Sequence, residues 1–260
     1  MTVSSYSCLL LVVQSIRLIC SMADKPKRIT KVIIDGDVLV YRAAFATQDK
    51  PPEEAENIIN QLMDYVIGQT IMFPHGDNFF VWLTGRGNFR YDLAKTQEYK
   101  GNRRDNVKPA HYQHIREYLQ TEWGAQVTEG CEADDAISIE AYKGNLESTV
   151  IVSVDKDFDT VPCWRFDFSK GVFIENTPES ALRFFYEQVL TGDRVDAILG
   201  LHGIGPKKAQ KILEGATTEY ELFQKCLDAY EGDYERVVEN GRLLHLQVYE
   251  GELWRPPDET

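Results

Sequence analysis

The segment Lys31-Val-Ile-Ile-Asp-Gly-Asp37 is the clearest indication of the fold. Its short apolar run ends in an acid, which predicts a buried strand over residues 31–35. Gly36-Asp37 then supplies a turn and an N-cap, because aspartate is a preferred capping residue. We therefore expect a helix from Val38 to about Ala46.

The same alternation of strand and helix continues along the chain. Apolar runs at Phe79–Leu83 and Thr149–Val154 predict two more strands, and Pro51-Pro52 opens another helix. Strands that alternate with helices indicate an α/β fold, with a central, mainly parallel sheet flanked by helices. Ligands of such sheets bind beyond the carboxyl ends of the strands. Asp35 ends the first predicted strand and Asp155 directly follows the third, so both lie at such carboxyl ends.

The chain divides into three parts by its sequence character. Residues 29–190 form the expected α/β domain, and within it 86–108 is a long Gly- and Arg-rich stretch of weak periodicity. Residues 191–260 contain Gly turns and short helical patterns, which predict a helical subdomain. Residues 1–28 read as an N-terminal extension outside the fold. Its apolar run at 8–13 lacks the preceding basic residues of a signal peptide, which is the alternative interpretation.

Composition restricts the class of protein. The 260 residues carry 28 Lys+Arg against 41 Asp+Glu, a net charge of -13, and 43 % of them are hydrophobic. This composition excludes collagen-like and wholly disordered chains. It also argues against coating nucleic acid through bulk charge, although a local basic patch could still bind phosphate. We expect a monomer with no membrane partner.

The cysteines favour a reducing compartment. All five are widely spaced and none forms a C-x-x-C pair, so a disulfide framework or a structural zinc site is not expected. No run approaches the ~20 apolar residues of a membrane span. We therefore expect a cytoplasmic protein.

Acidic residues recur at the ends of the predicted elements. The groups are Asp35 and Asp37; Glu132, Asp134 and Asp135; Asp155 and Asp157; and Asp193 and Asp196. Taken alone, Asp37 favours a helix cap, and the acids from Glu132 onward could complement a helix dipole. Asp193 and Asp196 would share a face if their stretch is helical.

The acids as a set favour a metal site over these separate explanations. Converging carboxylates repel one another unless a cation lies between them, and hard Mg²⁺ or Mn²⁺ ions prefer oxygen ligands. Two such ions, roughly 3.5–4 Å apart, can catalyse phosphodiester hydrolysis. The hypothesis is therefore a two-metal phosphodiesterase site.

Two basic segments complement the acids. In Tyr99-Lys100-Gly-Asn-Arg103-Arg104, cations could neutralise a scissile phosphate and the ring could stack on a base, although a solvated loop is the alternative. In the segment 201–213, a Gly203-Ile-Gly205 turn precedes Pro206 at the start of a helix. Its free N–H groups, with Lys207, Lys208 and Lys211, suit a DNA backbone; a plain helical hairpin is the alternative.

Together these motifs resemble the flap endonuclease/5′-nuclease family over about residues 31–213. The likeness is strongest to the 5′-to-3′ exonucleases of short-tailed bacteriophages, then to the 5′-nuclease domain of bacterial DNA polymerase I. The motifs are Ile34-Asp-Gly-Asp37, Tyr99-Lys-Gly-Asn-Arg103, Glu132-Ala-Asp-Asp135, Ser153-Val-Asp-Lys-Asp157, Gly192-Asp-Arg-Val-Asp196 and Gly200-Leu-His-Gly-Ile-Gly205.

The resemblance implies a PIN/5′-nuclease-like sheet, a helical arch at 86–108 and a C-terminal helix–three-turn–helix. Its implied first metal site is Asp35, Glu132, Asp134 and Asp155, and its second is formed or bordered by Asp135, Asp157, Asp193 and Asp196. The implied phosphate and DNA contacts are Lys100, Arg103, Arg42, a stacking Tyr99, Arg104, Gly203, Gly205, Lys207, Lys208 and Lys211, with a K⁺ ion at the helix–three-turn–helix.

The implied activity is a Mg²⁺-dependent 5′-to-3′ exonuclease or 5′-flap endonuclease, with two ions. Its partners would be DNA with 5′ ends, flaps or nicks, or an RNA–DNA hybrid, in the host cytoplasm if phage-encoded. The family has an aspartate after the second strand, but the stretch Leu83–Arg90 contains no carboxylate. Two alternatives therefore stay open: a metal-dependent ribonuclease, and a catalytically weakened binder of branched DNA.

Overall fold

A central six-stranded sheet organises the molecule, and the computed structural model describes residues 25–71, 78–103 and 106–258. The strand order is β3-β2-β1-β4-β5-β6, with β6 antiparallel to β5 and the other neighbours parallel. The strands are β1 (Lys31–Asp35), β2 (Phe79–Arg86), β3 (Gln126–Glu129), β4 (Thr149–Val152), β5 (Trp164–Asp167) and β6 (Val172–Glu175).

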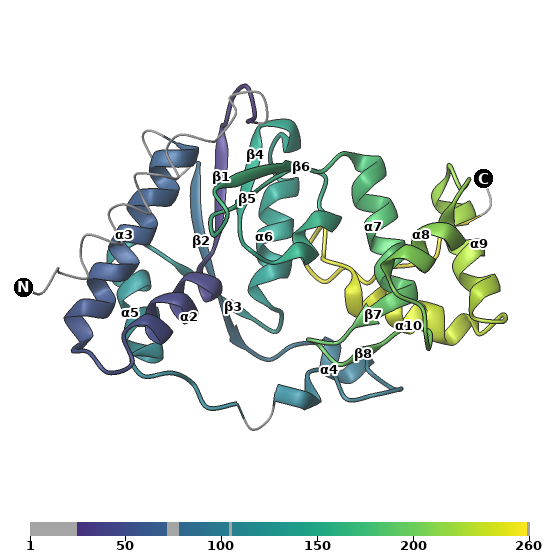
Figure 1. The fold of residues 1–260 in the computed structure, drawn as a ribbon, viewed down its shortest axis with the longest axis horizontal. Coiled ribbons are helices and arrows are strands. Elements are labelled where there is room, and N and C mark those ends of the chain that lie inside the picture. Colours follow the sequence, from purple (N-terminus) through teal and green to yellow (C-terminus); the bar gives the residue numbers. More distant parts are fainter. Residues whose placement is uncertain (1–24, 72–77, 104–105, 259–260) are drawn as a thin grey trace, which may run out of the picture.

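Helices cover both faces of this sheet (Figure 1). Val32 and Ile34 pack on the face covered by α2 (Gly36–Ala46), α3 (Pro52–Thr70) and α5 (Tyr112–Glu122). Ile33, which points to the opposite face because side chains alternate along a strand, packs against α6 (Ala133–Tyr142). The apolar run of β1 is therefore buried on both sides, as is typical of a parallel sheet.

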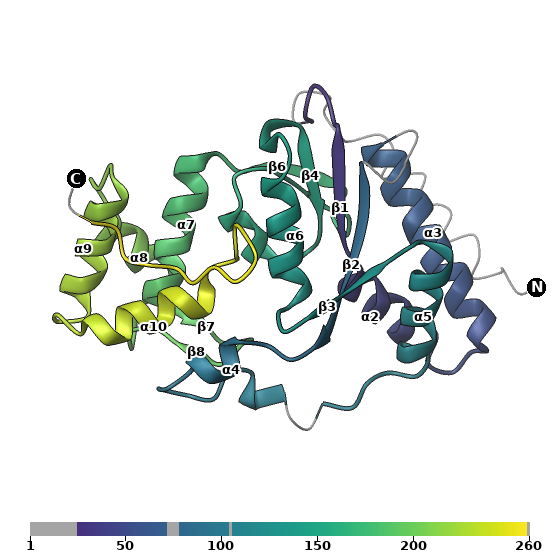
Figure 2. The same cartoon turned by 180° about the vertical axis from the view of Figure 1, so that it is seen from behind.

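A third core lies in the helical part, which adjoins the sheet on the side of α6 (Figures 1 and 2). Its helices are α7 (Pro178–Thr191), α8 (Pro206–Leu213), α9 (Glu219–Ala229) and α10 (Tyr234–Leu244). Phe185 and Tyr186 of α7 pack in this core with Trp254. The expected boundary near residue 190 falls at the end of α7, but the buried side chains of α7 pack with the helices that follow.

Residues 86–103 lead from β2 to this helical part, and residues 106–111 lead into α5 (Figure 2). The first of these segments contains α4 (Arg90–Leu93) and the short 3-10 turn η1 (Gly101–Arg103). Glu239 of α10 accepts the backbone N–H groups of Lys95 and Thr96, each at 2.8 Å. This part of the chain is therefore anchored on α10.

The strand order has a topological switch point at the carboxyl end of β1. From β1 the chain first adds β2 and β3 on one side, and it later returns to add β4 on the other side. Ligands of open α/β sheets bind at such a switch point. Asp35 ends β1 and Ser153 directly follows β4, so both lie at this switch point.

The predicted fold class is confirmed, with two local corrections. Asp35, not Asp37, caps α2, because its Oδ1 accepts the Val38 N–H. Asp193 and Asp196 do not lie on a helix: β7 (Gly192–Asp193) and β8 (Ile198–Leu199) pair as an antiparallel hairpin. The predicted strand at Phe79–Leu83 continues to Arg86.

Two further expectations concern the ends of the chain and membranes. Residues 1–24, most of the expected N-terminal extension, lie outside the described residues. Among the helices that are described, none is long and apolar enough to cross a membrane.

Candidate active site

Asp35 is the buried centre of the first group of acids. It is 3 % exposed, and Ser153 donates its hydroxyl to Asp35 Oδ2 at 2.7 Å. The same Ser153 oxygen accepts the backbone N–H of Asp155 at 3.0 Å. One hydroxyl therefore ties the acid at the end of β1 to the loop after β4.

The start of α6 brings Glu132 and Asp134 to the same group. Glu132 is the N-cap of this helix, and Asp134 lies in its first turn. Burial, and then the negative charges of Asp35 and Glu132, raise the pKa of Asp134 well above its usual value. Burial, with Asp37 and Asp155 nearby, raises the pKa of Asp35 to about 7.

The second group of acids lies between η3 (Lys156–Thr160), α7 and the β7–β8 hairpin. Gln188 of α7 donates its amide to Asp157 Oδ1 at 2.6 Å. Burial, and then Asp155, Asp193 and Asp196, raise the pKa of Asp157 to about 7. Asp155 faces both groups of acids, since it also raises the pKa of Asp35 and Asp134.

Lys100 and Arg103 meet the acids from the stretch 86–108. Lys100 pairs with Glu132 and lies 3.5 Å from Asp196 Oδ2. Arg103 donates to Asp196 Oδ1 at 2.7 Å. Burial alone would lower the pKa of Lys100, but Glu132 and Asp196 outweigh it, so this pKa is raised. The two cations therefore partly neutralise the acids.

Tyr99 is too buried in this structure for the stacking role that the resemblance implies. Its ring is 2 % exposed within the helical core, so it cannot stack on a base in this conformation. Its hydroxyl lies 2.9 Å from Glu132 Oε2 and 2.8 Å from Asp196 Oδ2. Tyr99 is therefore a buried partner of the acids, and the solvated-loop interpretation does not apply to it.

Asp135, which the resemblance assigns to the second metal site, is paired within the protein. It is fully buried, and Arg90 donates to its two oxygens at 2.6 and 2.8 Å. Its Oδ2 also accepts the Glu132 N–H, which completes a capping box. Asp135 therefore holds the helix start in place, because its carboxylate is fully engaged within the protein.

The end of β2 has no carboxylate of its own but lies against Asp37. Asp37 Oδ2 accepts the Thr84 N–H at 2.8 Å, and Arg116 donates to Asp37 Oδ1 at 2.6 Å. At Gly85 a Cβ atom would lie 1.8 Å from the backbone oxygen of Thr128. No side chain can stand at position 85 without moving the neighbouring strand.

Two other DNA-contact candidates lie away from the acids or outside the described chain. Arg42 is an exposed residue of α2, and its guanidinium lies 5.2 Å from the Phe168 ring centre. Arg104 falls on residues that the structure does not describe.

The glycine turn before α8 has the expected form. Gly203 adopts a φ of +74°, which favours glycine, and Gly205 is the N-cap of α8. Lys208 Nζ donates to the Gly203 carbonyl at 2.8 Å. Lys207 and Lys211 are exposed on the same helix.

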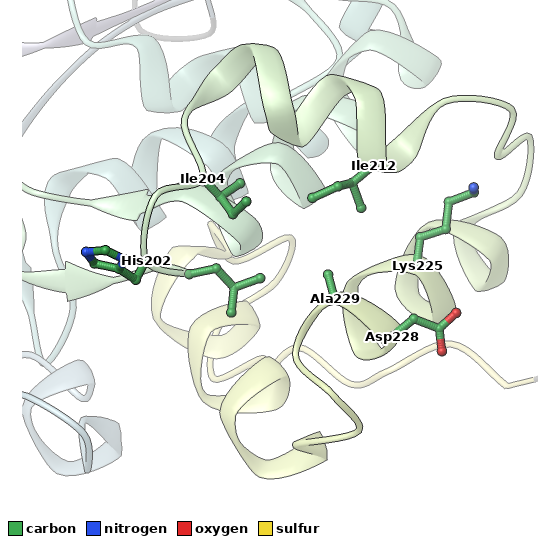
Figure 3. Close-up of a pocket in the computed structure, with 7 residues that line it drawn as sticks. His202, Ile204, Ile212, Lys225, Asp228 and Ala229 are labelled. Carbon is green, nitrogen blue, oxygen red and sulfur yellow. The ribbon is translucent and has the colours of Figure 1, made fainter.

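A groove adjoins this turn between α8 and α9 (Figure 3). Its apolar lining includes Leu201, Ile204 and Ile212, and Lys225 and Asp228 lie on the α9 side. It belongs to the helical part and not to the acids, so it is no candidate for the catalytic centre.

The acids fit a metal by their chemistry. Carboxylate oxygens are the ligands that Mg²⁺ and Mn²⁺ prefer. The raised pKa values of Asp35, Asp134 and Asp157 reflect first their burial and then their mutual repulsion. Within the described segments, no three acidic, histidine or cysteine side chains are placed to chelate a single ion. Protein donors engage the carboxylates instead.

Sequence reasoning missed several residues that organise this site. Ser153, Gln188, Arg90 and Arg116 each hold one of its carboxylates. Ser153 interrupts the apolar run 149–154, and Gln188 follows Glu187 at a position of α7 that the fold buries. The sequence signals for Ser153 were its polarity within that run and its place in the motif 153–157, whereas Gln188 had no such signal.

Comparison with known proteins identifies the family. Residues 30–162, about half of the chain, match the family described as the 5′-3′ exonuclease, N-terminal resolvase-like domain. The chain belongs to the 5′-3′ exonuclease family. The resemblance found in the motifs is thereby confirmed.

Relatives of this 5′-3′ exonuclease family member include polymerase and phage proteins. DNA polymerase I of Caldicellulosiruptor bescii is 28 % identical over 81 % of this chain and 27 % of its own length. The exodeoxyribonuclease of Enterobacteria phage T3 is 27 % identical, over 67 % of this chain and 63 % of its own length. The chain thus spans less than two thirds of these two relatives. The flap endonuclease of Escherichia phage T5 is 26 % identical, over 87 % of both chains.

A solved structure shares the fold. The T5 D15 protein co-crystallised with metal ions superposes with a TM-score of 0.63 at 20 % identity, covering 83 % of this chain and 89 % of the other. A complex of the T5 D15 flap endonuclease with DNA and metal ions gives a TM-score of 0.59.

Proposed function

We propose that this chain is a metal-dependent 5′-nuclease that hydrolyses phosphodiester bonds at DNA 5′ ends, nicks or flaps. The observation that carries the proposal is the gathering of acids from β1, α6, the loop after β4 and the β7–β8 hairpin. Burial, together with the negative charge of their neighbours, raises the pKa values of Asp35, Asp134 and Asp157, and perturbed carboxylates of this kind are typical of functional sites. Membership of the 5′-3′ exonuclease family supports the same reaction.

The acids divide between two proposed Mg²⁺ or Mn²⁺ sites. The first is Asp35, Glu132, Asp134 and Asp155, and the second is Asp157, Asp193 and Asp196. When bound, the ions would activate water and stabilise the leaving oxygen. That T5 D15 was crystallised with metal ions supports this assignment.

Lys100 and Arg103 are the proposed phosphate ligands. They are paired with Glu132 and Asp196 in this structure. Cations bound by the acids would weaken these ion pairs and leave both side chains available to a scissile phosphate. Arg42 would contact a more distant phosphate.

The turn before α8 is the proposed binding site for the backbone of duplex DNA. Backbone N–H groups at a helix start, together with Lys207, Lys208 and Lys211, suit phosphate oxygens without reading sequence. A K⁺ ion at this turn would compete with Lys208, which occupies the Gly203 carbonyl.

The proposed setting is the cytoplasm, where a monomer would remove primers or flaps during replication, or degrade DNA and support recombination. Asp155 is the residue to test first, since it faces both groups of acids. Asp155→Asn should abolish Mg²⁺-dependent cleavage and leave DNA binding near the wild-type level. The exposed Asp49 provides a matched control, and Asp49→Asn should cleave normally.

The assay compares 5′-labelled flap, nicked and blunt duplexes with an RNA strand and an RNA–DNA hybrid, on gels, for wild type and both variants. Cleavage of RNA alone would favour the ribonuclease alternative. DNA binding without cleavage in either Mg²⁺ or Mn²⁺ would favour the branched-DNA binder. Unchanged cleavage by Asp155→Asn would refute the assignment of the acids.

A further inference from the structure

Gln188 is a buried polar residue that touches the second group of acids from the helical part. Its side chain is 3 % exposed, although glutamine is mostly a surface residue. Its Nε2 donates to Asp157 Oδ1 at 2.6 Å. Because burying a polar group without partners costs free energy, such a residue needs an explanation beyond packing.

The other half of the same amide is unpaired. Gln188 Oε1 is buried and has no hydrogen-bond partner among the residues that the structure describes. The nitrogen of this amide is committed to Asp157, so the oxygen lies beside the same acids. A buried acceptor without a protein partner points to a donor from outside the chain, such as a water molecule.

The backbone of Gln188 is hydrogen-bonded to the start of the hairpin that carries Asp193. Its carbonyl accepts the N–H of Gly192, which ends α7 and begins the hairpin that carries Asp193. The next residue, Val189, accepts hydrogen bonds from Tyr230 and Asn240 of the helical part. Gln188 is therefore fixed from both sides, and its side chain can act as a rigid support.

We propose that Gln188 is a positioning residue of the second metal site, where its amide nitrogen orients Asp157 and its amide oxygen accepts a hydrogen bond from a water molecule of the bound cation. The inference rests on the proposed function, since it needs a cation at Asp157. Divalent Mg²⁺ keeps several of its waters in proteins, so acceptors around the acids are required. Removing a protein group that hydrogen-bonds to a metal ligand typically changes metal affinity 10- to 100-fold.

The decisive variant is Gln188→Met, which keeps the length and apolar packing of the side chain but removes both polar atoms. Gln247→Met is its matched control. Gln247 is also buried, and its amide donates to the Glu252 carbonyl at 2.8 Å, away from the second group of acids. Mn²⁺ binding is measured by calorimetry on the full chain without DNA, so the readout does not depend on activity.

We expect Gln188→Met to weaken Mn²⁺ binding at one site by about tenfold, whereas Gln247→Met changes it less than about twofold. Equal Mn²⁺ affinity in wild type and Gln188→Met would overturn the inference and leave the proposed function intact. Absence of Mn²⁺ binding by the wild type would overturn both.

If Gln188→Met does not fold, Gln188→Glu tests the role of Gln188 instead. The new carboxylate faces Asp157, so the metal-free melting temperature should fall above neutral pH. Because a cation would bridge the two carboxylates, saturating Mn²⁺ should raise that temperature more than it does for the wild type. A rise no larger than that of the wild type would contradict the role of Gln188.

Discussion

At the scale of single residues, the carboxyl groups of Asp35 and Asp157 are unusual acids. Burial and neighbouring carboxylates raise both pKa values from 3.8 to about 7. The folded chain therefore holds protons that the unfolded chain has already released between these two values. The cost of ionising these residues in the folded state makes the stability of the metal-free protein depend on pH.

In the metal-free protein, we expect Asp35 and Asp157 to make their full contribution to the free energy of unfolding below the unfolded pKa of 3.8. That contribution should be lost as the pH rises to about 7. Urea unfolding with a chelator at about pH 5 and about pH 8 measures the difference. Saturating Mg²⁺ should remove much of it, since the cation replaces the protons. The double variant Asp35→Asn/Asp157→Asn should have a flatter profile, and an unchanged profile would contradict the raised pKa values.

Gly85 gives a second prediction at this scale. A Cβ atom there would lie 1.8 Å from the Thr128 carbonyl oxygen and 2.9 Å from Val127 Cγ1. Gly85→Ala should lower the free energy of unfolding by at least about 2 kcal/mol, because the β2–β3 pairing must shift. Gly68, where a Cβ has open space, is the control, and Gly68→Ala should not destabilise α3. Equal thermal stability of both variants would refute the close approach at Gly85.

At the scale of elements, α8 carries a charge pattern that contrasts with the acidic chain. Three lysines lie within eight residues, preceded by a glycine turn that leaves N–H groups at the helix start unpaired by side chains. Ala209 and Leu213 of the same helix are buried in the helical core. One face thus holds the helix in place while the other presents positive charge.

The double variant Lys207→Ala/Lys211→Ala should weaken DNA binding, because each lysine that contacts a phosphate releases counterions. The slope of log K against log salt concentration should fall by about 0.9 for each lysine lost. Fluorescence anisotropy over a salt series measures it. Lys143→Ala is the control, since Lys143 follows α6 at the end opposite the acids and pairs with Glu140. A slope that is the same in wild type and double variant would exclude α8 from the interface.

At the scale of the whole molecule, one buried ion pair joins the sheet to the helical part. Arg90 binds Asp135 at the start of α6, and it also donates to the carbonyl oxygens of Leu243 and His245, at 2.9 and 2.8 Å. Asp135 Oδ1 accepts the Gln247 N–H. The segment after α10 is thus held directly against the helix that carries Glu132 and Asp134.

Breaking this pair from one side should be costly. Asp135→Asn leaves the buried Arg90 charge uncompensated, and we expect a loss of about 3–5 kcal/mol in the free energy of unfolding. The double variant Arg90→Met/Asp135→Asn should lose less than the sum of the single changes Arg90→Met and Asp135→Asn, because no unpaired charge remains. A double-mutant cycle from urea unfolding measures the coupling, and simple additivity would show that the pair is not coupled.

Much of the fold could be predicted from sequence, because the apolar runs of β1 and β4 and the acids after them are local signals. The roles of Tyr99 and Asp135 could not. Each depends on a partner far along the chain, Asp196 for Tyr99 and Arg90 for Asp135, and no periodicity reveals such a partner. The cap of α2 went to Asp35 because Asp37 is engaged by Thr84 and Arg116, which lie on other elements.

Lys100 and Arg103 supply positive charge to the acids from within the chain. Since these two side chains already face Glu132 and Asp196, a preparation treated with a chelator should keep its native shape at neutral pH. DNA could then be loaded in advance, and the reaction started by adding Mg²⁺ alone. Such staging would let a single turnover be followed from a synchronised, fully assembled complex.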